Sequence, residues 1–321
     1  MKRASQRSYY GKALVELGEK NENVVVLDAD LGNSTKTIEF AKKYPERFFQ
    51  CGIAEQNMMG TAAGLATEGK IAFASTFAVF ATGRCWDQIR QSIAYPRLNV
   101  KIAATHCGIS VGGDGASHQA LEDIALMRAL PNMTVICPAD ANEAYKATIA
   151  AANIDGPCYI RMGRSDFPMV TEESAPFKIG KVTVMKKGKD VTLVGSGQMV
   201  SVCLEAAEIL KEDGVIAEVI NASTIKPLDI STLLESLERT RCVVTAEEHS
   251  IIGGLGSAVA ECISEVGSYP LARIGIRDSF GESGEPDELM VKYGLTKEDI
   301  VVSARKVMER KEKKKGFLWR K

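Results

Sequence analysis

The chain has 321 residues, 45% of them hydrophobic and 25% charged, which is enough for two globular domains of ordinary size. Its formal net charge of −1 argues against a nucleic-acid-binding protein, because such proteins usually concentrate basic charge on one face. No apolar run reaches the length of a membrane span and the N-terminal segment lacks the core of a signal peptide, so we expect a cytoplasmic protein without membrane or nucleic-acid partners.

Strand-like apolar runs alternate with segments of helical periodicity along the first half of the chain. This alternation predicts a doubly wound parallel sheet covered by helices on both faces, in a domain of residues 1–168. Strands are predicted at residues 24–30, 71–76, 100–106, 134–140 and 158–163. Helices are predicted at Tyr9–Lys20, Lys36–Tyr44, Glu55–Glu68, Trp86–Tyr95, His118–Ala129 and Asn142–Ala152.

The pattern lapses at residues 165–180, where two prolines and an acidic cluster suit an exposed connection, and we place a linker at residues 169–184. A second alternation follows and predicts a smaller α/β domain of residues 185–321. Its strands are predicted at residues 190–197, 215–223, 241–249 and 271–276, and its helices at Met199–Glu212, Leu228–Leu237 and Leu255–Val266.

Polar residues crowd the turn after the first predicted strand, where open α/β sheets place their ligand sites. Asp28, Asp30, Asn33 and Ser34 lie there. Taken alone, these residue types are explained by helix capping, for which Asp, Asn and Ser are preferred.

Two further segments carry residues that could hold a heteroaromatic ring. Glu55 begins a predicted helix, where the helix dipole favours a carboxylate, but its apolar neighbours, such as Ile53, would also suit proton exchange with a ring nitrogen. Phe77 and Phe80 follow a predicted strand three residues apart. That spacing is common in cores, yet aromatic faces can also stack on a flat ring.

A glycine-rich loop is bracketed by two of the three histidines of the chain, His106 and His118, and contains Asp114. Two imidazoles and a carboxylate could exchange hydrogen bonds with a polyhydroxylated substrate. A metal site is the weaker interpretation, because the other nearby candidate ligand, Cys107, shows no recognisable zinc spacing. We therefore expect no metal ligands in this loop.

Together these segments resemble transketolase, namely its pyrimidine-binding and C-terminal domains, over nearly the whole chain. The matching motifs are Ala29–Asp30–Leu31 with Ser34, Gly52–Glu55, Thr76–Phe80, Thr105–His106, Asp114–Gln119, Pro138–Asp140 and Arg164 after Arg161–Gly163. The resemblance implies a thiamine-diphosphate-dependent transferase of the pentose phosphate pathway. Such an enzyme moves a two-carbon ketol unit between sugar phosphates.

The resemblance also implies roles for individual residues. Glu55 matches the catalytic glutamate that hydrogen-bonds the pyrimidine ring of the cofactor, Phe77 and Phe80 match the aromatic wall around that ring, and Asp30 and Leu31 match further cofactor contacts. Two sets of substrate residues are implied. His106, Asp114 and His118 bind hydroxyl groups, and the two histidines also assist proton transfer. Arg7, Ser34 and Arg164 bind the phosphate.

Two departures from the family pattern matter. Gly83 stands where many transketolases have a third aromatic residue of the pocket. The domain that holds Mg²⁺ or Ca²⁺ and the diphosphate has no counterpart, since Arg7 already matches a site residue. We therefore expect a separate N-terminal-half subunit to bring that domain, with this chain as a homodimer within a two-plus-two heterotetramer.

Several alternatives remain at this point. The β subunit of a 2-oxoacid dehydrogenase shares the two-domain plan, but Thr105–His106 and the loop around Asp114 favour sugar phosphates. Deoxyxylulose-phosphate synthase has a different pair at Thr105–His106, and a non-catalytic regulatory paralogue would not need Glu55. Gly113–Gly115 with Asn142 match the GDG…N diphosphate motif of thiamine-diphosphate enzymes, which we interpret as coincidence because Asn142 starts a predicted helix.

Overall fold

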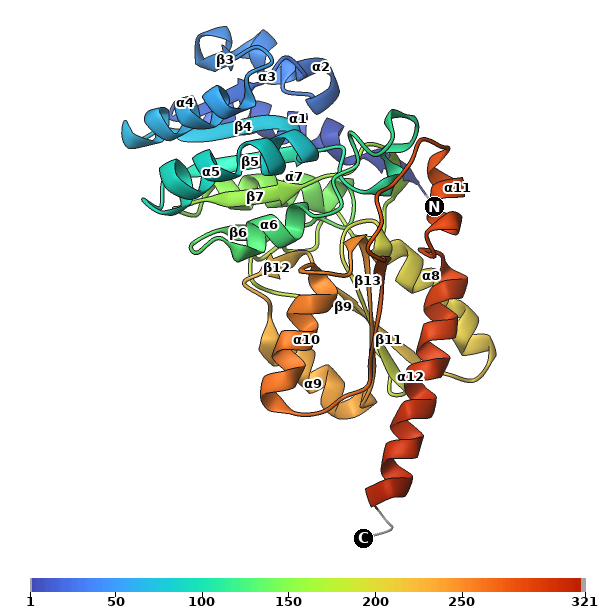
Figure 1. The fold of residues 1–321 in the computed structure, drawn as a ribbon. Helices are drawn as coiled ribbons and strands as arrows, with labels where there is room; N and C mark the ends of the chain where they lie inside the picture. Colours follow the sequence, from blue (N-terminus) through green and yellow to red (C-terminus); the bar gives the residue numbers. More distant parts are fainter. Residues whose placement is uncertain (1, 319–321) are drawn as a thin grey trace.

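Two stacked α/β units form the molecule, and the structure, a computed structural model, describes residues 2–318 with the side chains of residues 2–312 (Figure 1). The upper unit is built on a seven-stranded sheet in which six strands are parallel and one edge strand, β12, is antiparallel. In spatial order its strands are β12 (Thr224–Lys226), β6 (Thr134–Ile136), β7 (Cys158–Arg161), β5 (Val100–Thr105), β4 (Ile71–Phe77), β2 (Val24–Asp28) and β3 (Phe48–Gln50).

Helices cover both faces of this sheet, so its central strands are buried throughout, as the sequence pattern predicts. One face packs against helices rich in alanine and aromatic residues, and the other against a core of methionine, isoleucine and alanine. The helices are α1 (Gln6–Lys20), α2 (Gly32–Thr35), α3 (Ile38–Lys43), α4 (Glu55–Thr67), α5 (Trp86–Gln88), α6 (Asp123–Ala129) and α7 (Ala141–Ala152), with π-helical turns at Phe80–Arg84 and Ile89–Ala94 and short 3₁₀ segments at Pro45–Arg47 and Ile109–Asp114.

The lower unit contains a five-stranded sheet with α8 and α12 on one face and α9 and α10 on the other (Figure 1). Its strands, in spatial order, are β14 (Leu271–Ile276), β13 (Val243–Ser250), β10 (Val191–Gly195), β11 (Ala217–Asn221) and β9 (Thr183–Lys186). Its helices are α8 (Met199–Glu212), α9 (Ile230–Thr240), α10 (Leu255–Val266), α11 (Pro286–Lys292) and α12 (Lys297–Leu318).

The two units are interlocked. β12 belongs to the second half of the sequence but pairs with β6 of the upper sheet, and β1 (Arg3–Ser5) pairs with β8 (Asp166–Pro168). One continuous hydrophobic core joins α4 of the upper unit to α9 and α10 of the lower unit. The domain division at residues 1–168, 169–184 and 185–321 remains a prediction.

The predicted fold class, a doubly wound parallel sheet followed by a smaller α/β unit, is confirmed, and two predicted helices need correction. The helix predicted at Lys36–Tyr44 begins two residues later, at Ile38, because Lys36 has a left-handed φ of 71° and the hydroxyls of Thr35 and Thr37 bind the Asp28 carboxylate. The helix predicted at His118–Ala129 begins only at Asp123. The preceding backbone instead bridges to other segments, with Ala120 O accepting from Gly108 N.

Several elements are absent from the sequence prediction. They are the short strands β1, β3, β8, β9 and β12 and the helices α2, α11 and α12. Within residues 2–318, no helix is long and apolar enough to cross a membrane.

Candidate functional site

Glu55 is the first residue of α4, at the edge of the upper sheet where β2 and β4 end. The helix has no side-chain cap at Ala54, so the first-turn carboxylate of Glu55 complements the helix dipole there. The side chain is only 3% exposed, whereas Ile53, in the turn before it, is 80% exposed. A buried carboxylate therefore lies two positions after an exposed apolar residue.

Arg84 is the partner of Glu55, and sequence reasoning missed it. Its Nη1 lies 3.0 Å from Glu55 Oε2, and its guanidinium stands 4.5 Å from the centre of the Phe80 ring. The π-helical turn Phe80–Arg84 places both groups together. At Gly83 no atom lies within 4 Å of the position of an added Cβ, so the place of the family's third aromatic residue is open.

Four rings meet beside this pair. Phe77 stacks on His106 at a centroid distance of 3.7 Å, and on Phe80 at 5.9 Å with 17° between their planes. The half-buried ring of His118 meets Phe77 and Phe80 edge-on at 6.2 and 5.3 Å. The structure therefore brings together four residues that the sequence nominated from two separate segments.

His106 has an unusual backbone and an unusual environment. It directly follows β5 with a left-handed φ of 58°, and its Nδ1 lies 2.9 Å from Thr105 Oγ1. Burial, together with the positive charges of Arg7 and Arg164, lowers the pKa of His106 to about 3. The imidazole is therefore neutral near pH 7, with one nitrogen as donor and the other as acceptor.

The predicted phosphate residues also converge. Arg7 donates from Nη1 to Ser34 O at 2.8 Å and from Nη2 to Arg164 O at 2.7 Å, and Arg164 donates to Val111 O at 2.7 Å. Burial and the neighbouring Arg164 lower the pKa of Arg7, and the buried Nε of Arg7 has no hydrogen-bond partner. An anion bound near both guanidinium groups would offset the repulsion that lowers the pKa of Arg7.

The turn after β2 lies next to the turn before Glu55. The side-chain oxygen of Gln50 accepts from Asp30 N at 2.9 Å and Gly52 N at 3.1 Å. Asp28 has a structural role, because its buried carboxylate accepts from Leu31 N at 2.6 Å and from two threonine hydroxyls. Asp30 is exposed, with a left-handed φ of 65°, and so stays available to a ligand.

The glycine-rich loop lies at the border of the two units. Asp114 is exposed on it, and Ser117 Oγ lies 2.9 Å from His118 Nδ1. Asn142 is the second residue of α7 and donates to Thr171 O at 2.7 Å. Among the residues that the structure describes, no group of three or more His, Cys, Asp or Glu side chains could hold a metal ion.

Two family models cover nearly all of the chain. The model of the transketolase pyrimidine-binding domain matches residues 2–169, and the model of the transketolase C-terminal domain matches residues 180–300. A protein of Methanocaldococcus jannaschii described as a transketolase C-terminal section is 54% identical over 310 residues, which are 96% of each chain. A 6-deoxy-6-sulfo-D-fructose transketolase subunit of a Clostridium species is 43% identical over 95% of each chain.

Among solved structures, a split-gene transketolase described as an inactive β4 tetramer superposes with a TM-score of 0.90 and 56% identity, over 95% of this chain and 98% of that one. Human transketolase is 38% identical over 93% of this chain. The alignment spans only 48% of the human protein, so this chain corresponds to about half of it.

Proposed function

Because this chain belongs to the transketolase family, we propose that it is the C-terminal subunit of a two-chain transketolase, which transfers a two-carbon ketol unit between sugar phosphates. The observation that carries the proposal is the meeting of Glu55, the stacked rings of Phe77 and Phe80, and the neutral imidazole of His106 at one edge of the upper sheet. The dehydrogenase, synthase and regulatory alternatives have no comparable support from the relatives.

The residues fit the aminopyrimidine ring of thiamine diphosphate. Phe77 and Phe80 offer nearly parallel aromatic faces, Glu55 offers a sheltered carboxylate, and the space at Gly83 is open. We assign the cofactor contacts of this chain to these residues together with Asp30 and Leu31. When bound, thiamine diphosphate supplies the nucleophilic carbon that carries the ketol unit.

The chain's own substrate groups divide into two sets. Arg7, Ser34 and Arg164 form the phosphate-binding set, supported by the unpaired Nε of Arg7 and by the positive charge of Arg164, which lowers the pKa of Arg7. The second set binds hydroxyl groups and comprises His106, Asp114 and His118. Since the pKa of His106 lies near 3, this imidazole is neutral at pH 7 and can both donate and accept a hydrogen bond.

A separate N-terminal-half subunit is the proposed partner, in a heterotetramer of two chains of each kind. It would hold Mg²⁺ or Ca²⁺ and the diphosphate. Support comes from the half-length alignment to human transketolase, and from the related split-gene protein whose tetramer is described as inactive.

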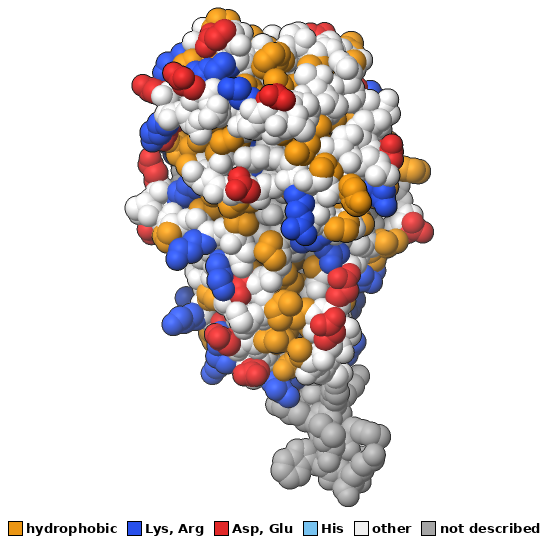
Figure 2. Space-filling view, turned by 90° about the vertical axis from the view of Figure 1, so that its left-hand side faces the viewer, with side chains coloured by type: hydrophobic (Ala, Val, Ile, Leu, Met, Phe, Trp, Pro, Cys, Tyr) orange, Lys and Arg blue, Asp and Glu red, His pale blue; other side chains and the backbone are white. Residues whose placement is uncertain are grey.

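The surface also suits an assembly. Figure 2 shows hydrophobic side chains spread down the middle of one face. The exposed side chain of Ile53, two residues before Glu55, is of the kind that a partner subunit buries. We also propose a cytoplasmic location and a role in the pentose phosphate pathway.

The experiment is an assay with thiamine diphosphate, magnesium, xylulose 5-phosphate and ribose 5-phosphate, on this chain alone and with a candidate N-terminal-half protein. Ketol transfer is expected only in the mixture. Glu55→Ala should abolish it while the complex still assembles in size-exclusion chromatography, and Glu68→Ala, at the other end of α4, should leave it unchanged. Near-full activity of Glu55→Ala, or decarboxylation of a 2-oxoacid in place of ketol transfer, would contradict the proposal.

A further inference from the structure

The loop that carries the proposed substrate residues has little regular structure of its own. It runs from His106 to Gln119 and contains a 3₁₀ segment, Ile109–Asp114, that is kinked at Gly112. Gln119 Nε2 supports the loop by donating to Ile109 O at 3.2 Å and to Glu282 O at 2.9 Å. Such a loop keeps one conformation only if neighbouring elements satisfy its backbone groups.

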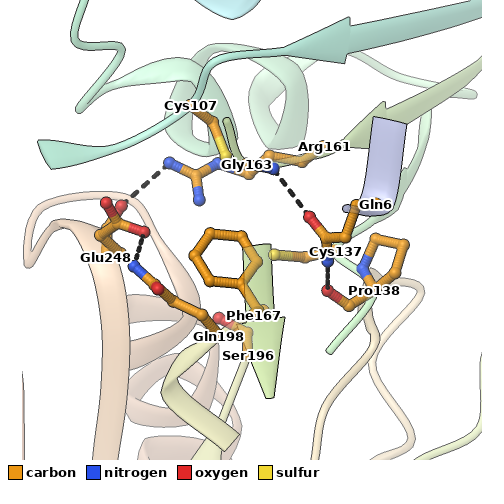
Figure 3. Close-up of a pocket in the computed structure, with 11 residues that line it drawn as sticks. Gln6, Cys107, Cys137, Pro138, Arg161, Gly163, Phe167, Ser196, Gln198 and Glu248 are labelled. Atoms are coloured by element: carbon orange, nitrogen blue, oxygen red, sulfur yellow. Dashed lines mark hydrogen bonds between the residues drawn. The ribbon is translucent and has the colours of Figure 1, made fainter. Parts of the chain in front are cut away.

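Glu248 of β13, in the lower unit, provides such a contact. Its side chain is 4% exposed, and Oε1 accepts from the backbone N–H of Ser110 at 2.5 Å. Its other oxygen, Oε2, accepts from Gln198 Nε2, as the close-up shows (Figure 3). Burial raises the pKa of Glu248, but its Oε1 still gives the buried backbone N–H of Ser110 an acceptor, and without that oxygen the N–H would be unpaired.

The loop packs directly onto this carboxylate. A Cβ added at Gly108 would lie 2.3 Å from Glu248 Cδ, and the φ of Gly108, 77°, is one that other residues rarely adopt. The cavity that remains between Glu248, Arg161 and Gln6 has a volume of about 10 Å³, which leaves space for one water molecule at most (Figure 3). The contact between loop and carboxylate is therefore close and specific.

A second set of bonds fixes the strand that carries Glu248. Arg161 of β7 donates to Glu248 O at 2.9 Å while pairing with the buried carboxylate of Asp123 at 2.7 Å. The next residue, His249, accepts from the backbone N–H groups of Ile124 and Ala125 at 3.2 and 3.4 Å. β13 is thus held against β7 and α6 of the upper unit.

We propose that Glu248 is a positioning residue, through which the lower unit sets the conformation of the loop that carries His106, Asp114 and His118. Ser110 lies between His106 and Val111, whose carbonyl accepts from Arg164. Fixing Ser110 therefore fixes a hydroxyl-binding residue and the partner of a phosphate-binding residue together. This inference rests on the proposed function for its kinetic part, and not for its structural part.

The test uses three variants of the full chain. Glu248→Ala leaves the Ser110 N–H without its acceptor. In Glu248→Gln the amide oxygen still accepts from Ser110, and Gln198 can rotate its amide to match. The control is Glu218→Ala, which removes an equally buried carboxylate of the lower unit that pairs with Arg239 and does not touch the loop.

Hydrogen exchange of peptides covering residues 107–119 is measured by mass spectrometry on each chain, and kinetics on each reconstituted complex. For Glu248→Ala we expect at least tenfold faster exchange at Ser110 and at least a tenfold higher KM for the sugar phosphate. The Kd of thiamine diphosphate should change less than the KM, because Glu55, Phe77 and Phe80 lie on other segments and only the two rings contact the histidines of the loop. Glu248→Gln should restore most of both changes, and Glu218→Ala should show neither.

Exchange and KM at wild-type values in Glu248→Ala would overturn the inference, as would equal changes in Glu218→Ala, since these would indicate general destabilisation. If the wild-type complex has no ketol-transfer activity, that result contradicts the proposed function instead. In that case the exchange measurement, made on this chain alone, still decides whether Glu248 holds the loop.

Discussion

Replacing His106 by asparagine distinguishes the effect of this residue on the reaction from its effect on the stability of the fold. A non-glycine residue in the left-handed region costs about 1–2 kcal/mol, and asparagine tolerates that region better than histidine. Loss of the stack on Phe77, at 3.7 Å, costs about 0.5–1.5 kcal/mol. The two effects oppose each other, so the free energy of unfolding should change by no more than about 1 kcal/mol.

The kinetic effect should be much larger. If the neutral imidazole of His106 hydrogen-bonds a substrate hydroxyl, its loss leaves a partner unpaired and costs about 2 kcal/mol, which corresponds to about a 30-fold decrease in kcat/KM. Urea unfolding of the chain and initial rates of the complex measure the two quantities. Arg97→Asn is the matched control, because Arg97 has a φ of 60° on an exposed turn, and its kcat/KM should not change.

A kcat/KM for His106→Asn within about threefold of the wild-type value would refute this reasoning. So would a loss of several kcal/mol in the free energy of unfolding, since His106 would then be retained for packing. The comparison with Arg97→Asn excludes an effect of the left-handed backbone alone.

Two further predictions concern the phosphate-binding set and the pH dependence of stability. Arg7→Lys should raise the KM of a phosphorylated ketose about tenfold and that of its unphosphorylated analogue less than threefold. The reason is that one ammonium cannot bond Ser34 O, Arg164 O and a phosphate with the geometry of a guanidinium. Equal effects on both substrates would contradict this prediction. Burial lowers the pKa of His249 from 6.5 to about 4. Its contribution to the free energy of unfolding is therefore present above pH 6.5 and is lost as the pH falls through 4. The loss is at most about 3 kcal/mol, at about 1.4 kcal/mol per pH unit. Burial raises the pKa of the neighbouring Glu247 from 4.5 to about 7, so its contribution is present below pH 4.5 and is lost as the pH rises through 7. We therefore compare each variant with the wild type by urea unfolding between pH 6.5 and 4.5. On acidification, the free energy of unfolding relative to that of the wild type should rise in His249→Gln and fall in Glu247→Gln. Differences from the wild type that do not change with pH would contradict this.

Helical periodicity and strand runs located the elements that bury a broad apolar face. The predicted helices Met199–Glu212 and Leu255–Val266 match α8 and α10, because each has a continuous stripe of buried residues. β12 could not be found in this way, since its three residues are defined by pairing with β6, far away in the sequence. The break at Lys36 depends on the Asp28 carboxylate, which a local pattern does not reveal.

For the site, the position of Phe77 and His106 at the end of a predicted strand, and of Glu55 at the start of a predicted helix, was enough to name them as candidates, whereas their partners were not visible. Arg84 ends a π-helical turn and pairs with Glu55, which lies 29 positions earlier, and Glu248 reaches Ser110 across 138 positions of sequence. Both contacts depend on tertiary packing, which overrides what a single segment prefers.

The strained backbone of the chain gives an independent argument for where the site lies. Among residues 2–318, seven non-glycine residues have a positive φ. Lys36 and Arg241 are the C-caps of α2 and α9, where a left-handed residue commonly ends the helix, and Arg97 and Asn132 lie in turns three residues after a helical segment. The remaining three, Asp30, His106 and Asp278, come within two residues of the ends of β2, β5 and β14 instead.

No helix end accounts for the left-handed conformation of these three residues. Asp30 and His106 lie at the edge of the sheet where ligands of open α/β folds bind, and the segment after Asp278 packs onto the loop between His106 and Gln119, with Gly281 against Gln119. Strain of about 1–3 kcal/mol per residue persists only where the surroundings enforce it, and it concentrates at functional sites. The backbone therefore points to the same edge of the sheet as the side chains of Glu55 and Arg7, although neither argument depends on the other.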